Sequence, residues 1–145
     1  MRAMLLADEL TKDGHQVTII SSSFFHQRKS FRSKKSKIIK VKKNLKIILI
    51  NSSGYKKNIS LRRIYDHINL AFNLHKFLKK NKGFRPDKIF VGYPPIETSY
   101  VIITWAKKNN IPVMLDVKDN WPENFLEPFP KYLKKIVRFF LFPYY

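Results

Sequence analysis

Short apolar runs alternate with longer stretches of helical periodicity along the chain, and this alternation limits the possible folds more than any other feature. We expect strands at residues 17–20, 46–51, 88–92 and 112–117, and helices at residues 1–13, 61–82, 97–109 and 130–142. Helices that alternate with buried strands are typical of a parallel sheet covered on both faces. The predicted fold class is therefore α/β, with a Rossmann-like parallel sheet and helices on both of its faces.

The strongest helix prediction covers residues 61–82, where apolar residues recur every three or four positions. The recurring positions are Leu61, Ile64, Tyr65, Ile68, Ala71, Phe72, His75 and Leu78. Ser60 is a suitable N-cap for this helix, and Gly83 is a suitable stop. We expect one face of the helix to be buried against the sheet.

The first predicted element is a helix, which is unusual for a doubly wound sheet. In such a sheet the first strand lies centrally, and a glycine-bearing turn leads from it into the first helix. Here Gly14 follows the helix instead, in the position of a left-handed C-terminal residue. Either the protein has a different topology, or its first strand is missing from this sequence. A sheet without that strand exposes an unpaired edge, so we expect the chain alone to be poorly soluble or marginally stable.

Positive charge dominates the composition, with 29 Lys and Arg residues against 10 Asp and Glu residues. An anionic partner is therefore the first to consider, whether nucleic acid, an acidic membrane surface or a phosphorylated substrate. The alternative is an AT-rich coding bias, because Lys occurs here together with abundant Ile, Asn and Phe. Cations are densest at residues 24–44, where we expect a solvated, mobile loop rather than a binding groove.

Several kinds of site are excluded or disfavoured by the residue types present. Cys is absent, which excludes disulfides and thiolate metal sites. His67 and His75 are two helical turns apart, too far to share an ion, so we expect no metal. The four glycines form no phosphate-binding loop, so we expect neither a nucleotide cofactor nor redox or kinase activity. No stretch has the length and apolar character of a membrane span or a signal peptide, and we expect a cytoplasmic protein.

Two loops that follow predicted strands share prolines and polar side chains. The first loop spans residues 92–98 and contains Tyr93 and Pro94, and the second spans residues 117–123. Both lead into helices, so in a parallel sheet both lie at the carboxyl edge, where α/β proteins bind ligands. The prolines stiffen the first loop, which suits the wall of a binding site.

The second loop carries the candidate catalytic residue. Asp119 is a candidate general base or a ligand for a sugar hydroxyl, and Lys118 is a candidate phosphate contact. Trp121 is suited to stacking on a ring, and Asp116 and Glu123 bring carboxylates to the same edge. The alternatives are that Asp119 caps the next segment, Lys118 is solvated and Trp121 packs beneath the loop. Their grouping on one edge favours a site.

Three stretches of the chain resemble sugar transferases with the two-domain GT-B fold. Residues 2–20, 84–95 and 111–123 are similar to segments of the N-terminal domain of family 4 glycosyltransferases, which build capsule, O-antigen and other surface polysaccharides. The most specific part of the resemblance is the run Asp119-Asn120-Trp121-Pro122-Glu123. The likeness extends over most of the chain.

The resemblance implies an N-terminal domain that binds a glycan or lipid-linked acceptor and faces a C-terminal domain that binds the nucleotide-sugar donor. The candidate substrate-binding residues are Arg2, Tyr93, Pro94, Lys118, Asp119, Trp121 and Glu123. Family members usually have a strand and a glycine-rich loop before the helix that bears the residue matching Arg2. The resemblance thus implies a fragment of a hexosyltransferase-type enzyme, without its donor domain and inactive alone. Some related enzymes have a His after the strand that ends at Val117, whereas this chain has Lys118 and Asp119.

Two further hypotheses concern anionic surfaces. Residues 131–142 combine cations with a bulky apolar face, as in a helix that lies on the inner face of a membrane; the alternative is a core helix of a truncated domain. A second functional hypothesis is a nucleic-acid-binding module that uses the cations of residues 28–46 and the rings of Phe24, Phe25 and Phe31. The aromatic residues cluster before the cations and no known binding signature is present, so the sugar transferase hypothesis is favoured.

Overall fold

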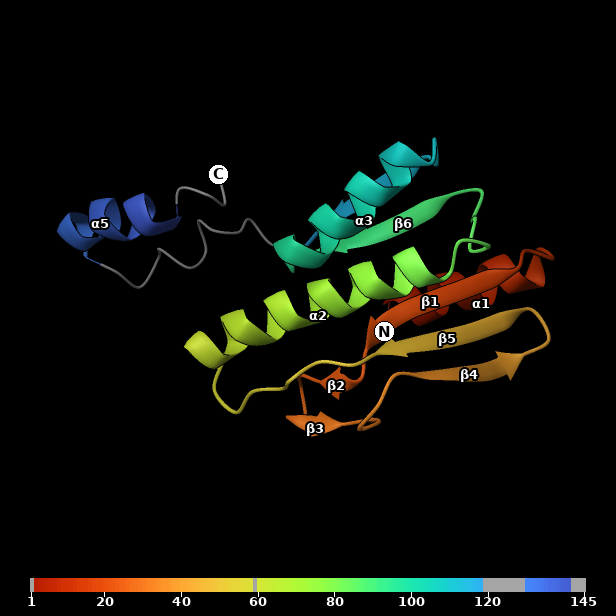
Figure 1. The fold of residues 1–145 in the computed structure, drawn as a ribbon, viewed down its shortest axis with the longest axis horizontal. Coiled ribbons are helices and arrows are strands. Elements are labelled where there is room, and N and C mark those ends of the chain that lie inside the picture. Colours follow the sequence, from red (N-terminus) through yellow and green to blue (C-terminus); the bar gives the residue numbers. More distant parts are fainter. Residues whose placement is uncertain (1, 59, 119–129, 142–145) are drawn as a thin grey trace. The chain divides into compact units, whose positions relative to one another are not determined.

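The computed structural model describes residues 2–58, 60–118 and 130–141. The chain divides into an N-terminal unit, Met1–Lys82, and a C-terminal unit, Gly83–Tyr145 (Figure 1). Each unit combines helices with strands and contains a pair of parallel strands. The predicted α/β class is therefore confirmed.

The N-terminal unit is built on a three-stranded sheet in the order β1-β5-β4. The three strands are β1, Val17–Ser22; β4, Lys37–Lys42; and β5, Leu45–Ile50. β1 runs parallel to β5, with Ile19 opposite Ile47, and β4 runs antiparallel to β5. Parallel neighbours need a long connection. Here the connection contains β4 and a small antiparallel pair, β2 (Phe24–Phe25) and β3 (Ser30–Phe31).

β4 shows that the prediction of a solvated, mobile loop at residues 24–44 was wrong. The strand pairs with β5 although all six of its side chains are exposed. Lysines alternate there with Ile38, Ile39 and Val41, and β-branched residues favour strands. The hydrogen bonds of a sheet are made by backbone groups, so a strand can form without burying its side chains. The high density of Lys hid this pattern in the sequence.

The two edge strands of this sheet differ in their protection against further pairing. β4 carries Lys37, Lys40 and Lys42, and its pairing shifts register between the last two. Lysines and bulges are the devices by which natural edge strands avoid unwanted partners. β1 has no charged residue, and among the described residues it pairs with β5 alone. The unpaired side of β1 therefore lacks the protection that β4 has.

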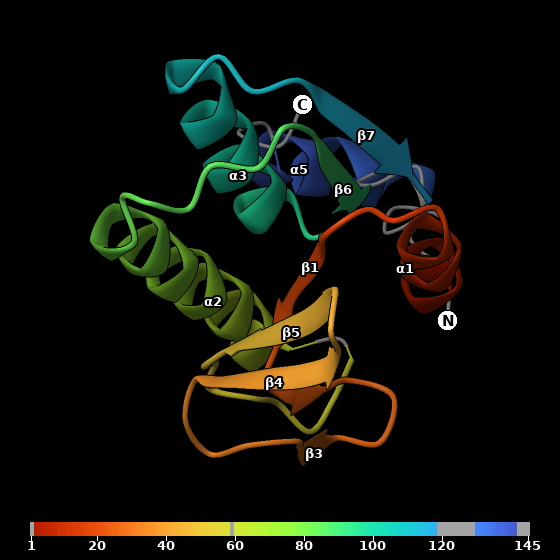
Figure 2. The same ribbon diagram turned by 90° about the vertical axis from the view of Figure 1, so that its right-hand side faces the viewer.

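β5 lies at the centre of the core of the N-terminal unit. Leu45 and Ile50 are 1% and 2% exposed. Helix α1, Arg2–Lys12, contacts β1, and helix α2, Leu61–Lys80, contacts β5. Figures 1 and 2 show these two helices on opposite faces of the sheet. The prediction of helices on both faces is confirmed for this unit.

α2 begins where the sequence predicted and ends slightly earlier. Ser60 is its N-cap, and the Ser60 hydroxyl accepts a hydrogen bond of 3.3 Å from the Arg63 amide. The C-cap is Asn81 rather than Gly83. The Asn81 side chain donates to the carbonyl of Phe77 at 2.7 Å, which satisfies an end carbonyl without a left-handed glycine.

The face that α2 buries matches the predicted one only at Ala71 and Leu78. The buried residues are Asp66, Ala71, Leu74 and Leu78. Of the positions predicted from periodicity, those that are exposed are Leu61, Ile64, Tyr65, Ile68, Phe72 and His75. The helix thus has two apolar stripes at different angles around its axis, and spacing alone does not tell which one faces the sheet.

The C-terminal unit contains a strand-helix-strand arrangement made of β6, Ile89–Tyr93; α3, Ile96–Lys108; and β7, Val113–Val117. β6 and β7 are parallel, with Gly92 opposite Asp116, and α3 contacts β6. Ala106 of α3 is fully buried. A further helix, α5, spans Lys131–Leu141. These four elements lie within a residue or two of their predicted limits.

The expectation of a sheet that is parallel throughout is only partly correct. It holds for β1 with β5 and for β6 with β7, but antiparallel β4 makes the first sheet mixed. Membership of β1 and β6 in a single Rossmann-like sheet stays a prediction. In the described parts of the chain, no helix has the length and apolar character needed to cross a membrane.

Candidate functional site

The carboxyl ends of β6 and β7 bring the two predicted loops together. Because the strands are parallel, Tyr93 and Val117 end them at the same edge of the sheet. The amide of Lys118 donates a hydrogen bond of 3.0 Å to the carbonyl of Tyr93, which joins the two loops directly. For the described part of both loops, the predicted common edge is confirmed.

The Lys118 side chain lies across the end of β6. Its amino group is 3.9 Å from Asp116 Oδ2, and a Cβ atom placed on Gly92 would come within 3.1 Å of it. The Lys118 side chain is 45% exposed and that of Asp116 is 17% exposed. A long, partly exposed ion pair contributes little to stability. Lys118 can therefore turn toward an anionic ligand at small cost.

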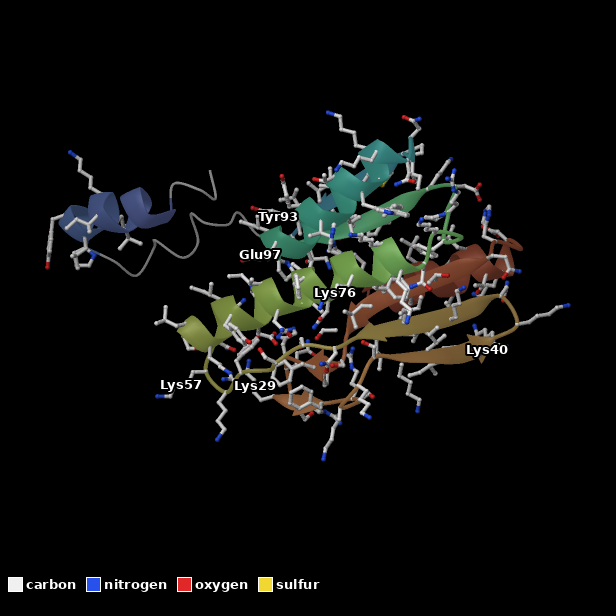
Figure 3. All side chains as sticks on the ribbon, in the orientation of Figure 1. Lys29, Lys40, Lys57, Lys76, Tyr93 and Glu97 are labelled. Atoms are coloured by element: carbon white, nitrogen blue, oxygen red, sulfur yellow. The ribbon has the colours of Figure 1, made fainter. Side chains whose placement is uncertain are left out.

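Tyr93 and Glu97 lie close together where β6 leads into α3 (Figure 3). Burial raises the pKa of the Tyr93 hydroxyl above its ordinary value, and the Glu97 carboxylate raises this pKa further. The phenol is therefore protonated at neutral pH and can donate a hydrogen bond. Glu97 lies in the first turn of α3, where the helix dipole favours a carboxylate.

Pro94 and Pro95 form the connection between β6 and α3, and the peptide bonds before both are cis. Pro95 is the N-cap of α3 and offers no side-chain cap. The hydroxyl of Ser99 instead donates to the Pro95 carbonyl at 2.9 Å, and Ser99 is 3% exposed. This hydrogen bond attaches the loop to α3, and Pro94 is partly buried in it. Its place in the wall of a binding site stays a prediction.

The structure does not test the other predicted site residues. Asp119, Trp121 and Glu123 lie outside the described residues. Arg2 is exposed at the start of α1, in the N-terminal unit. The roles of these four residues stay predictions. Within the described ranges, no group of three or more His, Asp or Glu side chains could hold a metal ion.

A second set of polar residues lies at the carboxyl ends of β1 and β5, and sequence reasoning missed it. The Ser23 amide, just after β1, donates a hydrogen bond of 2.8 Å to the carbonyl of Ile50. The hydroxyls of Ser22 and Ser52 lie 3.0 Å apart and share a hydrogen bond. These bonds join the loop after β1 to the loop after β5. The small β2–β3 pair belongs to the same end of the sheet (Figure 1).

Cations and aromatic rings are paired at this end of the N-terminal unit. Lys29 Nζ lies 4.4 Å from the centre of the Tyr55 ring, and Arg63 Cζ lies 5.8 Å from the same centre. Arg32 Cζ lies 4.5 Å from the centre of the Phe25 ring. Contacts of this kind stabilise both the cation and the loop that carries it. The sequence signal was the mixture of Phe and cations in residues 24–32, but the partners on α2 and after β5 are distant in sequence.

These contacts count against base stacking by the phenylalanines of this segment. Phe24 is 5% exposed and packs edge-on against Phe31, with the ring centres 5.2 Å apart. Phe25 has the guanidinium groups of Arg28 and Arg32 near its ring. Stacking on single-stranded nucleic acid requires open ring faces. The nucleic-acid hypothesis therefore loses two of its three proposed stacking groups.

No model of a known protein family matches the chain, and no curated protein matches it.

Proposed function

We propose that the chain is the acceptor-side domain of a glycosyltransferase, which moves a sugar from a nucleotide-sugar to a polysaccharide or lipid-linked acceptor. The observation that carries the proposal is the hydrogen bond between the Lys118 amide and the Tyr93 carbonyl, which joins the loops after β6 and β7. This bond brings a lysine, a phenol and carboxylates to the edge where α/β proteins bind their ligands.

Each polar group at this edge suits one part of a phosphate-linked sugar acceptor. Lys118 contacts the phosphate as a point charge. Asp116 and Glu97 accept hydrogen bonds from sugar hydroxyls, and the Tyr93 phenol donates one. Asp119, in the adjoining loop, is the proposed general base that takes the proton of the attacking hydroxyl.

The proposed domain has a Rossmann-like sheet, in which a further parallel strand lies beside β1. The unpaired side of β1 supports this arrangement. The nucleotide-sugar is bound by a separate domain, as the family resemblance implies.

We also propose a peripheral position on the anionic inner face of a membrane. The net charge of +19 supports it, as do Tyr132 and Ile136, which are 72% and 54% exposed on the basic helix α5. Cationic amphipathic helices bind anionic interfaces in this way.

Acceptor binding tests the sugar transfer proposal. The probe is N-acetylglucosaminyl diphosphate with a short prenyl chain, titrated into the ¹⁵N-labelled 145-residue chain and followed by NMR. We expect saturable shifts of the Tyr93 and Lys118 amides. Lys118→Ala should weaken binding about tenfold, the effect of losing one charge-assisted hydrogen bond.

Lys88→Ala is the matched control, because Lys88 is an exposed lysine at the opposite, amino end of β6. This variant should bind the probe as the wild-type chain does. The absence of saturable binding, or equal weakening in both variants, would contradict the proposal.

A further inference from the structure

The His26 cluster consists of His26, Lys29, Arg32, Tyr55 and Arg63, at the carboxyl end of β1 and β5. His26 and Lys29 lie between β2 and β3, Arg32 directly follows β3, Tyr55 follows β5, and Arg63 belongs to the first turn of α2. Figure 3 shows Lys29 at this end of the unit, near Lys57, whereas Lys40 lies at the far end of the sheet. Two separate segments thus contribute positive charge to one place.

Lys29 and Arg63 are held in position by the same two residues. Both cations lie over the ring of Tyr55, as described above. Lys29 Nζ also donates a hydrogen bond to Asn58 Oδ1, and Arg63 Nη1 donates one of 3.0 Å to the Asn58 carbonyl. Long cationic side chains normally lose rotamer freedom when they bind a ligand. Here much of that freedom is already lost before binding.

The cations act together on His26. Burial lowers the pKa of the His26 imidazole below its ordinary value, and Lys29, Arg63 and Arg32 lower this pKa further, in that order. The three positive charges therefore reach a common point from the β2–β3 segment and from α2. The N-terminus of α2, capped by Ser60, adds its partial positive charge at the same end.

No described carboxylate neutralises these charges by an ion pair with Lys29, Arg32 or Arg63. The nearest acid along the chain is Asp66, which is 3% exposed and accepts hydrogen bonds from the Gly54 amide and the Ser53 hydroxyl. Its role is to fix the loop that carries Tyr55. An anion bound between these three cations would reduce the repulsion among them.

Two buried polar atoms of this region have no hydrogen-bond partner among the described residues. One is Arg63 Nε, and the other is the hydroxyl of Ser23, a residue with no exposed surface at the end of β1. Buried donors are nearly always satisfied in folded proteins. The Nε–H of Arg63 would gain an acceptor if its guanidinium turned toward a bound oxyanion.

We propose that the His26 cluster binds the dianionic phosphate group of a ligand. Three cations match the charge and the several oxygens of a phosphate better than the single charge of a carboxylate. The site belongs to the N-terminal unit and does not depend on the sugar transfer proposal, which concerns Tyr93 and Lys118. The ligand is a small phosphomonoester or the exposed phosphate of a lipid headgroup, since both present the same group.

Titration of the ¹⁵N-labelled chain tests this site. One arm uses inorganic phosphate at constant ionic strength, and the other uses vesicles that contain phosphatidic acid. We expect saturable shifts of the Tyr55 and Asn58 amides in the first arm if the ligand is free in solution, and binding to vesicles alone if it is a headgroup. In either case the anion should raise the pKa of His26, because it favours the imidazolium form.

Arg63→Ala and Lys29→Ala should each weaken phosphate binding about tenfold, while Arg63→Lys should retain part of it. Lys40→Ala is the control, because Lys40 is an exposed lysine at the other end of the sheet. Binding in neither arm would overturn the proposal, as would equal weakening by Lys40→Ala or identical shifts with sodium chloride. Unchanged Tyr93 and Lys118 amides during the titration would separate this site from the acceptor site.

Discussion

The two units of this protein each present loops at the carboxyl ends of a pair of parallel strands, but the charged side chains at those ends differ. The edge of β1 and β5 gathers Lys29, Arg32 and Arg63 against aromatic rings, without an ion pair to a described carboxylate. The edge of β6 and β7 sets a single lysine, Lys118, beside Asp116.

This difference teaches that the same backbone arrangement supports two kinds of recognition. A set of unpaired cations attracts any compact anion, and its strength falls as salt increases. A mixture of donors and acceptors discriminates by position, because each ligand group must meet a partner of the right kind. The edge of β1 and β5 therefore suits a compact anion, and the edge of β6 and β7 suits a ligand with many hydroxyl groups.

The largest expected effect comes from replacing Asp66. This residue stabilises only the edge of β1 and β5. Asp66→Ala leaves the buried Gly54 amide without its acceptor, and we expect it to destabilise the N-terminal unit by about 3 kcal/mol. Urea denaturation followed by amide signals from each unit measures this loss. Asp66→Asn keeps an acceptor oxygen and should lose less. Equal loss in the C-terminal unit would break the distinction between the two edges.

A smaller loss is expected for Gly54→Ala. The residue has φ of +69°, and a Cβ atom would lie 2.7 Å from Phe31 Cζ and 3.0 Å from Phe24 Cδ2. Backbone strain of this kind costs about 1 to 2 kcal/mol, which thermal melting can resolve. The control is Gly83→Ala, where a Cβ atom meets nothing within 4 Å. Equal effects of the two substitutions would show that Gly54 is not tightly packed against Phe31 and Phe24.

At the other edge, Gly92→Ala should change binding more than stability. The added Cβ atom would lie 3.1 Å from Lys118 Nζ, the mobile end of a flexible side chain that can move away. We expect a change of under about 0.5 kcal/mol in the free energy of unfolding. Acceptor binding should weaken a few-fold, because the displaced amino group no longer lies over β6. Isothermal titration calorimetry with the diphosphate probe measures the ratio, and unaltered affinity would remove Lys118 from the site.

The smallest expected effect is a pH dependence that belongs to the cationic edge. Between the lowered pKa of folded His26 and the ordinary value of 6.5, the unfolded chain binds more protons than the folded chain. The free energy of unfolding therefore rises with pH through this window and levels off above it. The His26→Gln variant should not show this rise. Unfolding free energies of both forms from about pH 5 to 8 provide the measurement. A stability difference that does not vary with pH would mean that neither burial nor the cations lower the pKa of His26.

Much of the fold follows from local pattern. The apolar runs before Ser21 and Asn51 form strands as predicted, and Ser60 and Gly14 mark helix ends by their own conformational preferences. The common edge of the loops after β6 and β7 also follows, because parallel strands point the same way.

The features that the sequence concealed depend on distant partners. β4 needs β5 to complete its hydrogen bonds, and within residues 37–42 the lysines, typical of a charged loop, outweigh the strand preference of the β-branched residues. Both apolar stripes of α2 have helical spacing, so only the sheet decides between them. The His26 cluster joins Lys29 to Arg63, which are brought together by Tyr55 and Asn58 rather than by sequence proximity.

The unequal edges of the first sheet have a consequence for assembly. A growing fibril needs two adhesive sides on every subunit, one to join the stack and one to receive the next member. Here lysines and a register shift block addition at β4, whereas β1 lacks this protection. Growth through this sheet would therefore stop after one addition at β1, because neither partner then offers an unprotected edge strand.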